Sequence, residues 1–254
     1  MPEIYYRISP VEQMLLDVAV DMEPVFTRDL IDALPDVNPQ VIRNALASLA
    51  RKGRLSRVKR GLYLRSEDQG MPIIEEPFSL ALALFPGYIA FSSALAYWRL
   101  IEYESFTVFI GTRSRSGTKE IGEYTFKAVS MGRRAQGAVF DGSVYVSTLE
   151  KTLFDCLYKP HHAGGYPLVA KAIYEADPDW HEVGRWFEHL GTPSLRRRAG
   201  YILSIAGDAP RWLLNDLRGI GDSRIWLDPT GPRRGRYVHD WRLNDNVGGL
   251  DAIG

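Results

Sequence analysis

Four prolines between residues 10 and 39 restrict the N-terminal part of this chain to short helices. Pro10 and Pro39 each follow a side chain that can cap a helix, so each fits the first turn of one. Pro24 and Pro35 are predicted to end the helices before them, because an interior proline removes a backbone donor and clashes with the preceding turn. The spacing therefore predicts three short helices within the first 53 residues.

The first predicted helix begins at Pro10, where Ser9 and Glu12 have the spacing of a capping box. Apolar residues recur along it at helical spacing and are expected to face a core: Met14, Leu15, Val18 and Met22. The acidic residues between them are expected to face water: Glu12, Asp17 and Asp21.

Two further helices are predicted before Gly53. Thr27 can cap a short helix that Pro35 ends, and Asn38 can cap a third that runs to Gly53 as its C-terminal glycine. The third helix has the apolar stripe Val41, Ile42, Ala45, Leu46 and Leu49. Its other face has little bulk and many hydrogen-bonding groups: Gln40, Arg43, Asn44, Ala47, Ser48 and Arg51.

A basic hairpin is predicted directly after these helices. Residues 55–58 and 62–65 have the pattern of two short strands, and Gly61 between them permits the positive φ of a tight turn. Three helices followed by a hairpin are typical of a winged helix-turn-helix, whose third helix enters the major groove of DNA. We therefore expect residues 1–66 to form a winged helix-turn-helix DNA-binding domain.

The distribution of charge supports this interpretation. The whole chain is neutral, with 31 basic and 31 acidic residues. From Pro39 to Arg65, however, it has no acidic residue and eight basic ones: Arg43, Arg51, Lys52, Arg54, Arg57, Lys59, Arg60 and Arg65. Such a stretch can neutralise phosphates, which makes binding depend steeply on salt.

The candidate DNA-binding residues follow from these positions: Gln40, Arg43, Asn44, Ser48, Arg51, Arg57, Lys59 and Arg60. Arginine favours guanine and asparagine or glutamine favours adenine, so Gln40, Arg43 and Asn44 are predicted to read bases. The hairpin residues are better placed for phosphates or the minor groove. Two alternatives are an ordinary solvated basic face and a winged helix that docks protein.

A linker is expected at residues 66–72, and a mixed α+β domain with several helices at residues 73–254. Strands are predicted at residues 106–110, 124–129 and 143–146. Helices are predicted at residues 78–84, 92–100, 168–176, 180–190, 195–206 and 212–217. Ser147 and Glu150 have capping-box spacing and predict one more helix, which ends before Pro160. Residues 111–142 match no motif.

The sequence indicates no enzyme, cofactor or metal. It has no P-loop, dinucleotide fingerprint or nucleophile elbow. Cys156 is the one cysteine, which excludes an intramolecular disulfide, and its place on an apolar helix face predicts a core position. The adjacent His161 and His162 have no nearby acidic partner and do not match metal-ligand spacing.

The sequence does not identify what two arginine clusters contact. They are Arg196, Arg197 and Arg198 at a predicted helix start, and Arg233, Arg234 and Arg236 in a tail rich in proline and glycine. Solvated faces explain most such runs, although a DNA-backbone, RNA or protein contact suits arginine equally. Without a signal peptide or an apolar run of about 18 residues, we expect a soluble cytoplasmic protein with no membrane contact.

Several segments in this order resemble the antitoxin component of abortive-infection E toxin–antitoxin systems, the AbiEi-like regulators. They are residues 60–63 (RGLY), 88–95 (YIAFSSAL), 147–155 (STLEKTLFD) and 227–232 (LDPTGP), followed by a terminal segment with Trp241 and Asn244. The resemblance covers nearly the whole chain.

The resemblance implies a type IV toxin–antitoxin transcriptional regulator that represses its own operon by binding inverted repeats at the promoter. Its C-terminal domain would oppose a co-encoded toxin that resembles nucleotidyltransferases, without a stable complex between the two. The alternative is an interaction module that binds its partner toxin directly and recognises no specific DNA.

Overall fold

The computed structural model describes residues 7–67, 70–102, 105–219 and 223–248. Its internal contacts divide the chain into two compact units. Unit 1 comprises Met1–Phe85 and Thr118–Phe126, and unit 2 comprises Pro86–Gly117 and Lys127–Gly254. The predicted linker at residues 66–72 therefore lies inside unit 1.

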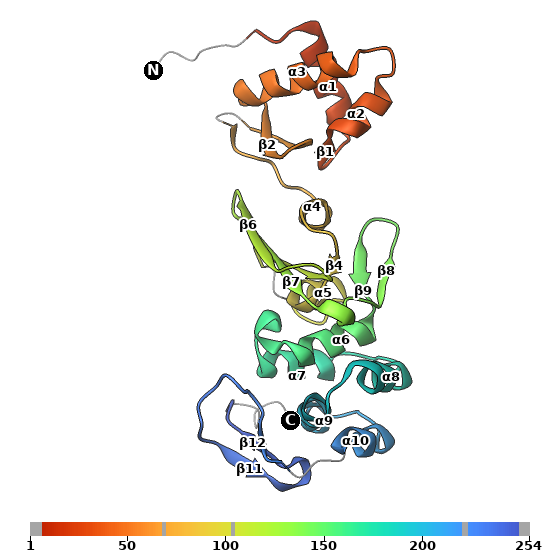
Figure 1. Cartoon of the computed structure of the whole chain (residues 1–254), viewed down its shortest axis with the longest axis vertical. Helices are drawn as coiled ribbons and strands as arrows, with labels where there is room; N and C mark the ends of the chain where they lie inside the picture. Colours follow the sequence, from red (N-terminus) through yellow and green to blue (C-terminus); the bar gives the residue numbers. More distant parts are fainter. Residues whose placement is uncertain (1–6, 68–69, 103–104, 220–222, 249–254) are drawn as a thin grey trace. The chain divides into compact units, whose positions relative to one another are not determined.

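Residues 7–67 of unit 1 form three helices and three strands in the order α1, β1, α2, α3, β2 and β3 (Figure 1). The helices are α1 (Pro10–Ala19), α2 (Thr27–Ala33) and α3 (Pro39–Arg51). The strands are β1 (Val25–Phe26), β2 (Leu55–Lys59) and β3 (Leu62–Arg65), which form an antiparallel sheet in the order β1-β3-β2. The three predicted helices and the predicted hairpin are thus present, together with the short strand β1.

Helix starts follow the capping side chains. The Ser9 hydroxyl accepts from the Glu12 N–H, while the Glu12 carboxylate accepts from the Ser9 N–H at 2.7 Å. Asn38 caps α3 by accepting from the Gln40 N–H at 2.8 Å. The prediction for Thr27 was wrong: it is the first helical residue, and Phe26 precedes it without a side-chain cap.

The core of unit 1 lies between the three helices and the sheet. Its fully buried residues include Leu15, Leu30, Ile42, Leu46 and Leu49. Two expectations about these helices were wrong. Val41 is 43% exposed instead of joining the apolar stripe, and Glu12 is only 3% exposed instead of facing water.

Glu12 is buried because Lys52, directly after α3, supplies a cation for it. Lys52 Nζ lies 2.7 Å from each carboxylate oxygen and also donates to the Arg7 carbonyl. Burial would raise the pKa of Glu12, but the hydrogen bonds from Lys52 and Ser9 outweigh it and lower that pKa to about 2. Helical periodicity alone does not reveal a partner 40 residues away.

Unit 1 also contains α4 (Pro77–Leu84) and a later segment, Thr118–Phe126. That segment contains most of β6 (Gly117–Ile121), the turn that follows it and the first residues of β7 (Tyr124–Ser130). Lys119 Nζ donates to the Val58 carbonyl of β2, and a Cβ placed on Gly122 would lie 3.7 Å from Pro72. Unit 1 is therefore assembled from two separate stretches of the chain.

Six strands form one sheet in the order β6-β7-β5-β4-β9-β8. Those not yet given are β4 (Tyr88–Ile89), β5 (Thr107–Thr112), β8 (Ala138–Phe140) and β9 (Tyr145–Ser147). β4 pairs antiparallel with β5 and parallel with β9. Helix α5 (Phe91–Tyr97) follows β4 directly and contacts β5.

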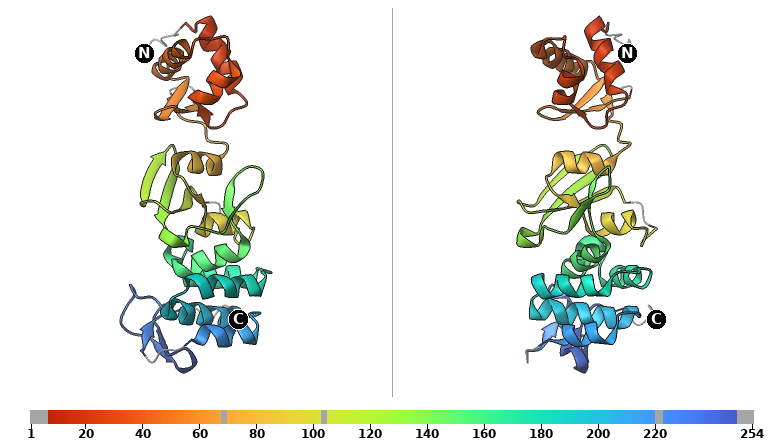
Figure 2. Two further views of the ribbon diagram at one scale, coloured as in Figure 1. Left: turned by 45° about the vertical axis from the view of Figure 1, so that its right-hand side comes forward. Right: turned by 90° about the vertical axis from the view of Figure 1, so that its right-hand side faces the viewer.

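Within the part of unit 2 that the structure describes, five helices follow the sheet strands (Figure 2). They are α6 (Leu149–Tyr158), α7 (Tyr166–Tyr174), α8 (Trp180–Leu190), α9 (Pro193–Ala206) and α10 (Arg211–Arg218). Helix α6 contacts α7, α8 and α9, and α9 also contacts α10. The strands β10 (Ile225–Trp226), β11 (Arg236–Val238) and β12 (Leu243–Asp245) make a small sheet in the order β10-β12-β11.

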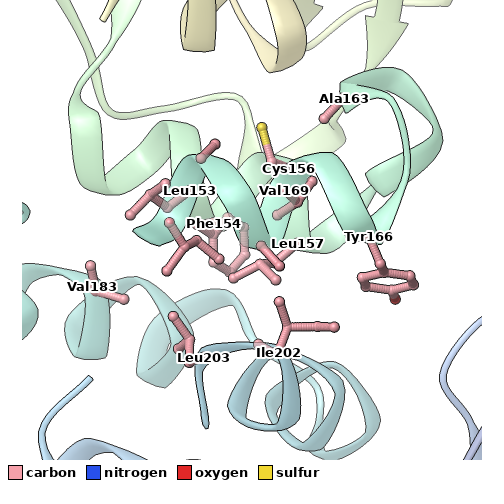
Figure 3. Close-up of a cluster of buried hydrophobic side chains, with 14 of the residues drawn as sticks. Leu153, Phe154, Cys156, Leu157, Ala163, Tyr166, Val169, Val183, Ile202 and Leu203 are labelled. Atoms are coloured by element: carbon pink, nitrogen blue, oxygen red, sulfur yellow. The ribbon is translucent and has the colours of Figure 1, made fainter. Parts of the chain in front are cut away.

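Helix α6 is the centre of the unit 2 core (Figure 3). Leu153, Phe154 and Leu157 are at most 1% exposed, and the core position predicted for Cys156 is confirmed by its complete burial. The predicted capping box was wrong by one residue. Thr148 caps α6 by accepting from the Lys151 N–H, whereas Ser147 ends β9 and bonds Thr152.

The fold is therefore mixed α+β, as the sequence predicts. Among residues 7–67, 70–102, 105–219 and 223–248, no helix has the length and apolar character needed to cross a membrane.

Candidate nucleic-acid interface

The exposed face of α3 presents four of the residues predicted to bind DNA: Gln40, Arg43, Asn44 and Arg51. Ile42, Leu46 and Leu49 on the opposite face are buried, which fixes the rotation of the helix about its axis. Gln40 Nε2 donates to Asn44 Oδ1 at 2.9 Å, so these two side chains hold each other in place. The helix thus offers amide and guanidinium groups together, the types that read base edges.

Ser48 occupies a different position from the other candidates on α3. It is half-buried, and its hydroxyl lies near the Glu12 carboxylate, where it helps to lower the pKa of Glu12. A nucleic acid would have to compete with Glu12 for this hydroxyl. Ser48 lies near Glu12 because of the way α1 packs against α3. The residue spacing along α3 alone does not predict this contact.

The basic hairpin, Leu55–Arg65, packs against α3 through β2. Arg57 is exposed on β2, and Arg60 is exposed in the turn, where Gly61 adopts φ +77°. Among the described residues, neither guanidinium has an ion-pair or hydrogen-bond partner. Both are therefore available to an anion in solution.

Other basic residues of the stretch have partners inside unit 1. Lys59 Nζ donates to the Ala83 carbonyl at the end of α4, and Lys52 pairs with Glu12. Arg65 lies 2.7 Å from Glu75. The charge pattern alone overstates the cationic surface, since these three side chains are engaged within the protein.

The arginines at the start of α9 also differ from the expectation of a solvated face. Each donates to a backbone carbonyl: Arg196 to Phe187, Arg197 to Ser223 and Arg198 to Trp226. Arg197 is only 3% exposed. These side chains fix neighbouring chain segments, which a single sequence does not reveal.

A buried polar cluster in unit 2 joins β4 and α6. The Lys151 ammonium pairs with Asp155 one turn later, and Tyr88 donates to Asp155 Oδ2 at 2.9 Å. Lys151 Nζ also lies 3.2 Å from the Tyr88 hydroxyl oxygen. Lys151 and Asp155 are completely buried, and burial lowers the pKa of the Lys151 amine. Because solvent does not reach this cluster, its main effect is on stability.

The chain is similar to known proteins in its fold. No protein-family model matches the chain, and a search of curated proteins finds no match. Among solved structures, the chain is similar to the crystal structure of the RV2827C protein from Mycobacterium tuberculosis, with a TM-score of 0.68 and 17% identity. The match covers 97% of this chain and 95% of that one. It shows a shared fold over nearly the whole length.

Proposed function

We propose that the first part of unit 1 is a winged helix-turn-helix that binds duplex DNA. Helix α3 inserts its exposed face into the major groove, and the basic hairpin lies along the phosphate backbone. The observation that carries the proposal is the combination of base-reading side chains on α3 with the exposed Arg57 and Arg60 on the adjoining hairpin. The absence of any acidic residue from Pro39 to Arg65 supports it.

Each candidate residue has a role in this proposal. Gln40, Arg43 and Asn44 read bases, and Arg51, Arg57 and Arg60 neutralise phosphates. The remaining two candidates, Ser48 and Lys59, contribute less, because each already has a partner within unit 1.

We further propose that the protein is the autorepressor and antitoxin of a toxin–antitoxin system. The ordered segments that resemble AbiEi-like regulators support this role. The DNA partner is then the inverted repeat in the promoter of its own operon, and unit 2 opposes a toxin that resembles nucleotidyltransferases.

Fluorescence anisotropy with the upstream DNA and a scrambled duplex tests the DNA-binding proposal. Three phosphate contacts per protomer give a salt slope of about −2.7, so a fourfold rise in salt weakens binding about 40-fold. Arg60→Ala removes one contact and reduces that loss to about 12-fold, with all sequences weakened alike. Arg43→Ala instead reduces the preference for the promoter by about 1 to 3 kcal/mol.

Arg185→Ala is the matched control, because Arg185 is an exposed arginine on α8 that lies outside the proposed interface. It should bind both duplexes like the unaltered protein. Equal, weak binding to promoter and scrambled DNA would refute sequence-specific recognition. A stable complex with the toxin on gel filtration, together with such equal binding, would favour the interaction module.

A further inference from the structure

A pocket of about 320 Å³ lies in unit 2, and none of the residues of the proposed DNA interface lines it. It is formed by the end of α6, the 3-10 turn Pro160–Ala163, the start of α7, the first turns of α9 and residues 228–230. This volume is at the lower end of the range for small-molecule sites. A ligand that fills it has to be the size of a small metabolite.

Two cations line the pocket. Arg198 Nε donates to the Trp226 carbonyl at 2.8 Å, which fixes the guanidinium plane. Among the described residues its two Nη groups have no hydrogen-bond partner, so they can form a bidentate contact with a phosphate. Lys159 Nζ donates to the Ser130 carbonyl at 3.2 Å, and an ammonium has two further N–H bonds to offer.

The same pocket contains an ionised carboxylate. Partial burial would raise the pKa of Asp228, but hydrogen bonds from the Thr230 hydroxyl and N–H, together with nearby His161, lower it. His161 Nε2 lies 3.5 Å from Asp228 Oδ1 and 3.2 Å from Thr230 Oγ1. Asp228 therefore repels an anion but accepts hydrogen bonds from hydroxyl groups.

The other walls are apolar or aromatic. Leu157 and Tyr166 belong to the core that Figure 3 shows, and Leu195 contributes from α9. The Tyr166 hydroxyl donates to the Leu227 carbonyl at 3.0 Å, which fixes its ring. A ligand for this pocket thus combines an anionic group, hydroxyls and an apolar or ring portion.

We propose that this pocket binds a ribonucleoside monophosphate. The phosphate contacts Arg198 and Lys159, the ribose hydroxyls donate to Asp228, and the base lies against the apolar and tyrosine walls. A carboxylate that accepts from ribose hydroxyls beside a phosphate site is an arrangement that nucleotide-binding proteins use. This site goes beyond the DNA-binding proposal and does not depend on it.

Isothermal titration of the full chain with each of the four ribonucleoside 5′-monophosphates tests the site. At least one should bind saturably, and its nucleoside and inorganic phosphate should each bind about tenfold or more weakly, because each lacks one half of the contacts. No saturable binding at millimolar nucleotide overturns the proposal. Phosphate that binds as tightly as the nucleotide overturns the ligand class.

Two variants locate the binding. Lys159→Gln should weaken the nucleotide about tenfold by removing a charged phosphate contact. Asp228→Asn retains an oxygen that can accept from Thr230 and should weaken the nucleotide but not inorganic phosphate. Arg185→Ala on α8 is the control and should leave binding unchanged, and circular dichroism verifies that each variant is folded. Unaltered affinity in both pocket variants would place the nucleotide elsewhere.

Discussion

Replacing Asp155 by asparagine should destabilise unit 2 strongly while leaving side-chain volume almost unchanged. The substitution keeps an amide oxygen that can accept from Lys151 but removes the negative charge that balances its ammonium. In this completely buried site the other partners of Lys151 are the Tyr88 hydroxyl and three aromatic rings. Ring centroids of Tyr88, Phe154 and Trp186 lie 5.4, 5.3 and 5.8 Å from its Nζ. Removing one partner of a buried pair costs about 3 to 5 kcal/mol.

The acid–base chemistry of Lys151 sets an upper limit on this cost. A lysine with an unfolded pKa of about 10.4 can be neutralised at pH 7 for about 4.6 kcal/mol, so the variant cannot lose more than that from its unpaired charge. The folded variant then binds fewer protons than the unfolded chain. Its stability should therefore rise with pH, by up to about 1.4 kcal/mol per unit, until the pH reaches the unfolded pKa.

Urea unfolding followed by tryptophan fluorescence measures this effect in unit 2 alone. All six tryptophans lie in that unit: Trp98, Trp180, Trp186, Trp212, Trp226 and Trp241. The triple variant Tyr88→Phe, Lys151→Met and Asp155→Leu removes both charges together with the hydroxyl that would otherwise lose both partners, and it should recover most of the loss. A decrease in the free energy of unfolding below about 1 kcal/mol, with no dependence on pH, would refute the reasoning, because a buried lysine without a counter-charge should destabilise the fold by more than that.

Two further outcomes are expected. The pKa of Glu12 is about 2 in the folded protein and 4.5 without its partners. Its ion pair therefore stabilises unit 1 above pH 4.5, and this stabilisation is lost as the pH falls toward 2. Glu12→Gln should flatten this part of an acid titration followed by circular dichroism, whereas the exposed Glu123→Gln should not; equal curves would contradict the assignment. Gly200→Ala should destabilise unit 2 by about 1 to 3 kcal/mol, because the added Cβ would lie 2.2 Å from the Trp241 ring. Tryptophan fluorescence in urea measures it, and a more stable variant would mean that helix propensity outweighs packing here.

The parts of the fold that the sequence predicted well have local causes. Capping side chains and prolines act within one turn, so the starts of α1 and α3 and the range of α8 agree with the prediction. Gly53 and Gly61 adopt positive φ where the helix end and the hairpin turn require it.

The features that the sequence did not predict depend on contacts between segments far apart in the chain. Strands β1 and β4 have two residues each, too few to show a period of two. Glu12 is buried by a lysine 40 residues away, and Lys59 is engaged by a carbonyl 24 residues away. The charge pattern therefore located the basic surface, while its available members became clear only from the packing.

The discontinuity of unit 1 also matters during synthesis. Its second stretch ends at Phe126, 41 residues after Phe85. At about 5 to 20 residues per second, the ribosome needs about 2 to 8 s to add those residues. During that interval β2 and the segment around Pro72 lack the hairpin that later contacts them. A nascent chain therefore carries an incomplete N-terminal unit, with these surfaces open to chaperones or to premature self-association, until β7 has begun to emerge.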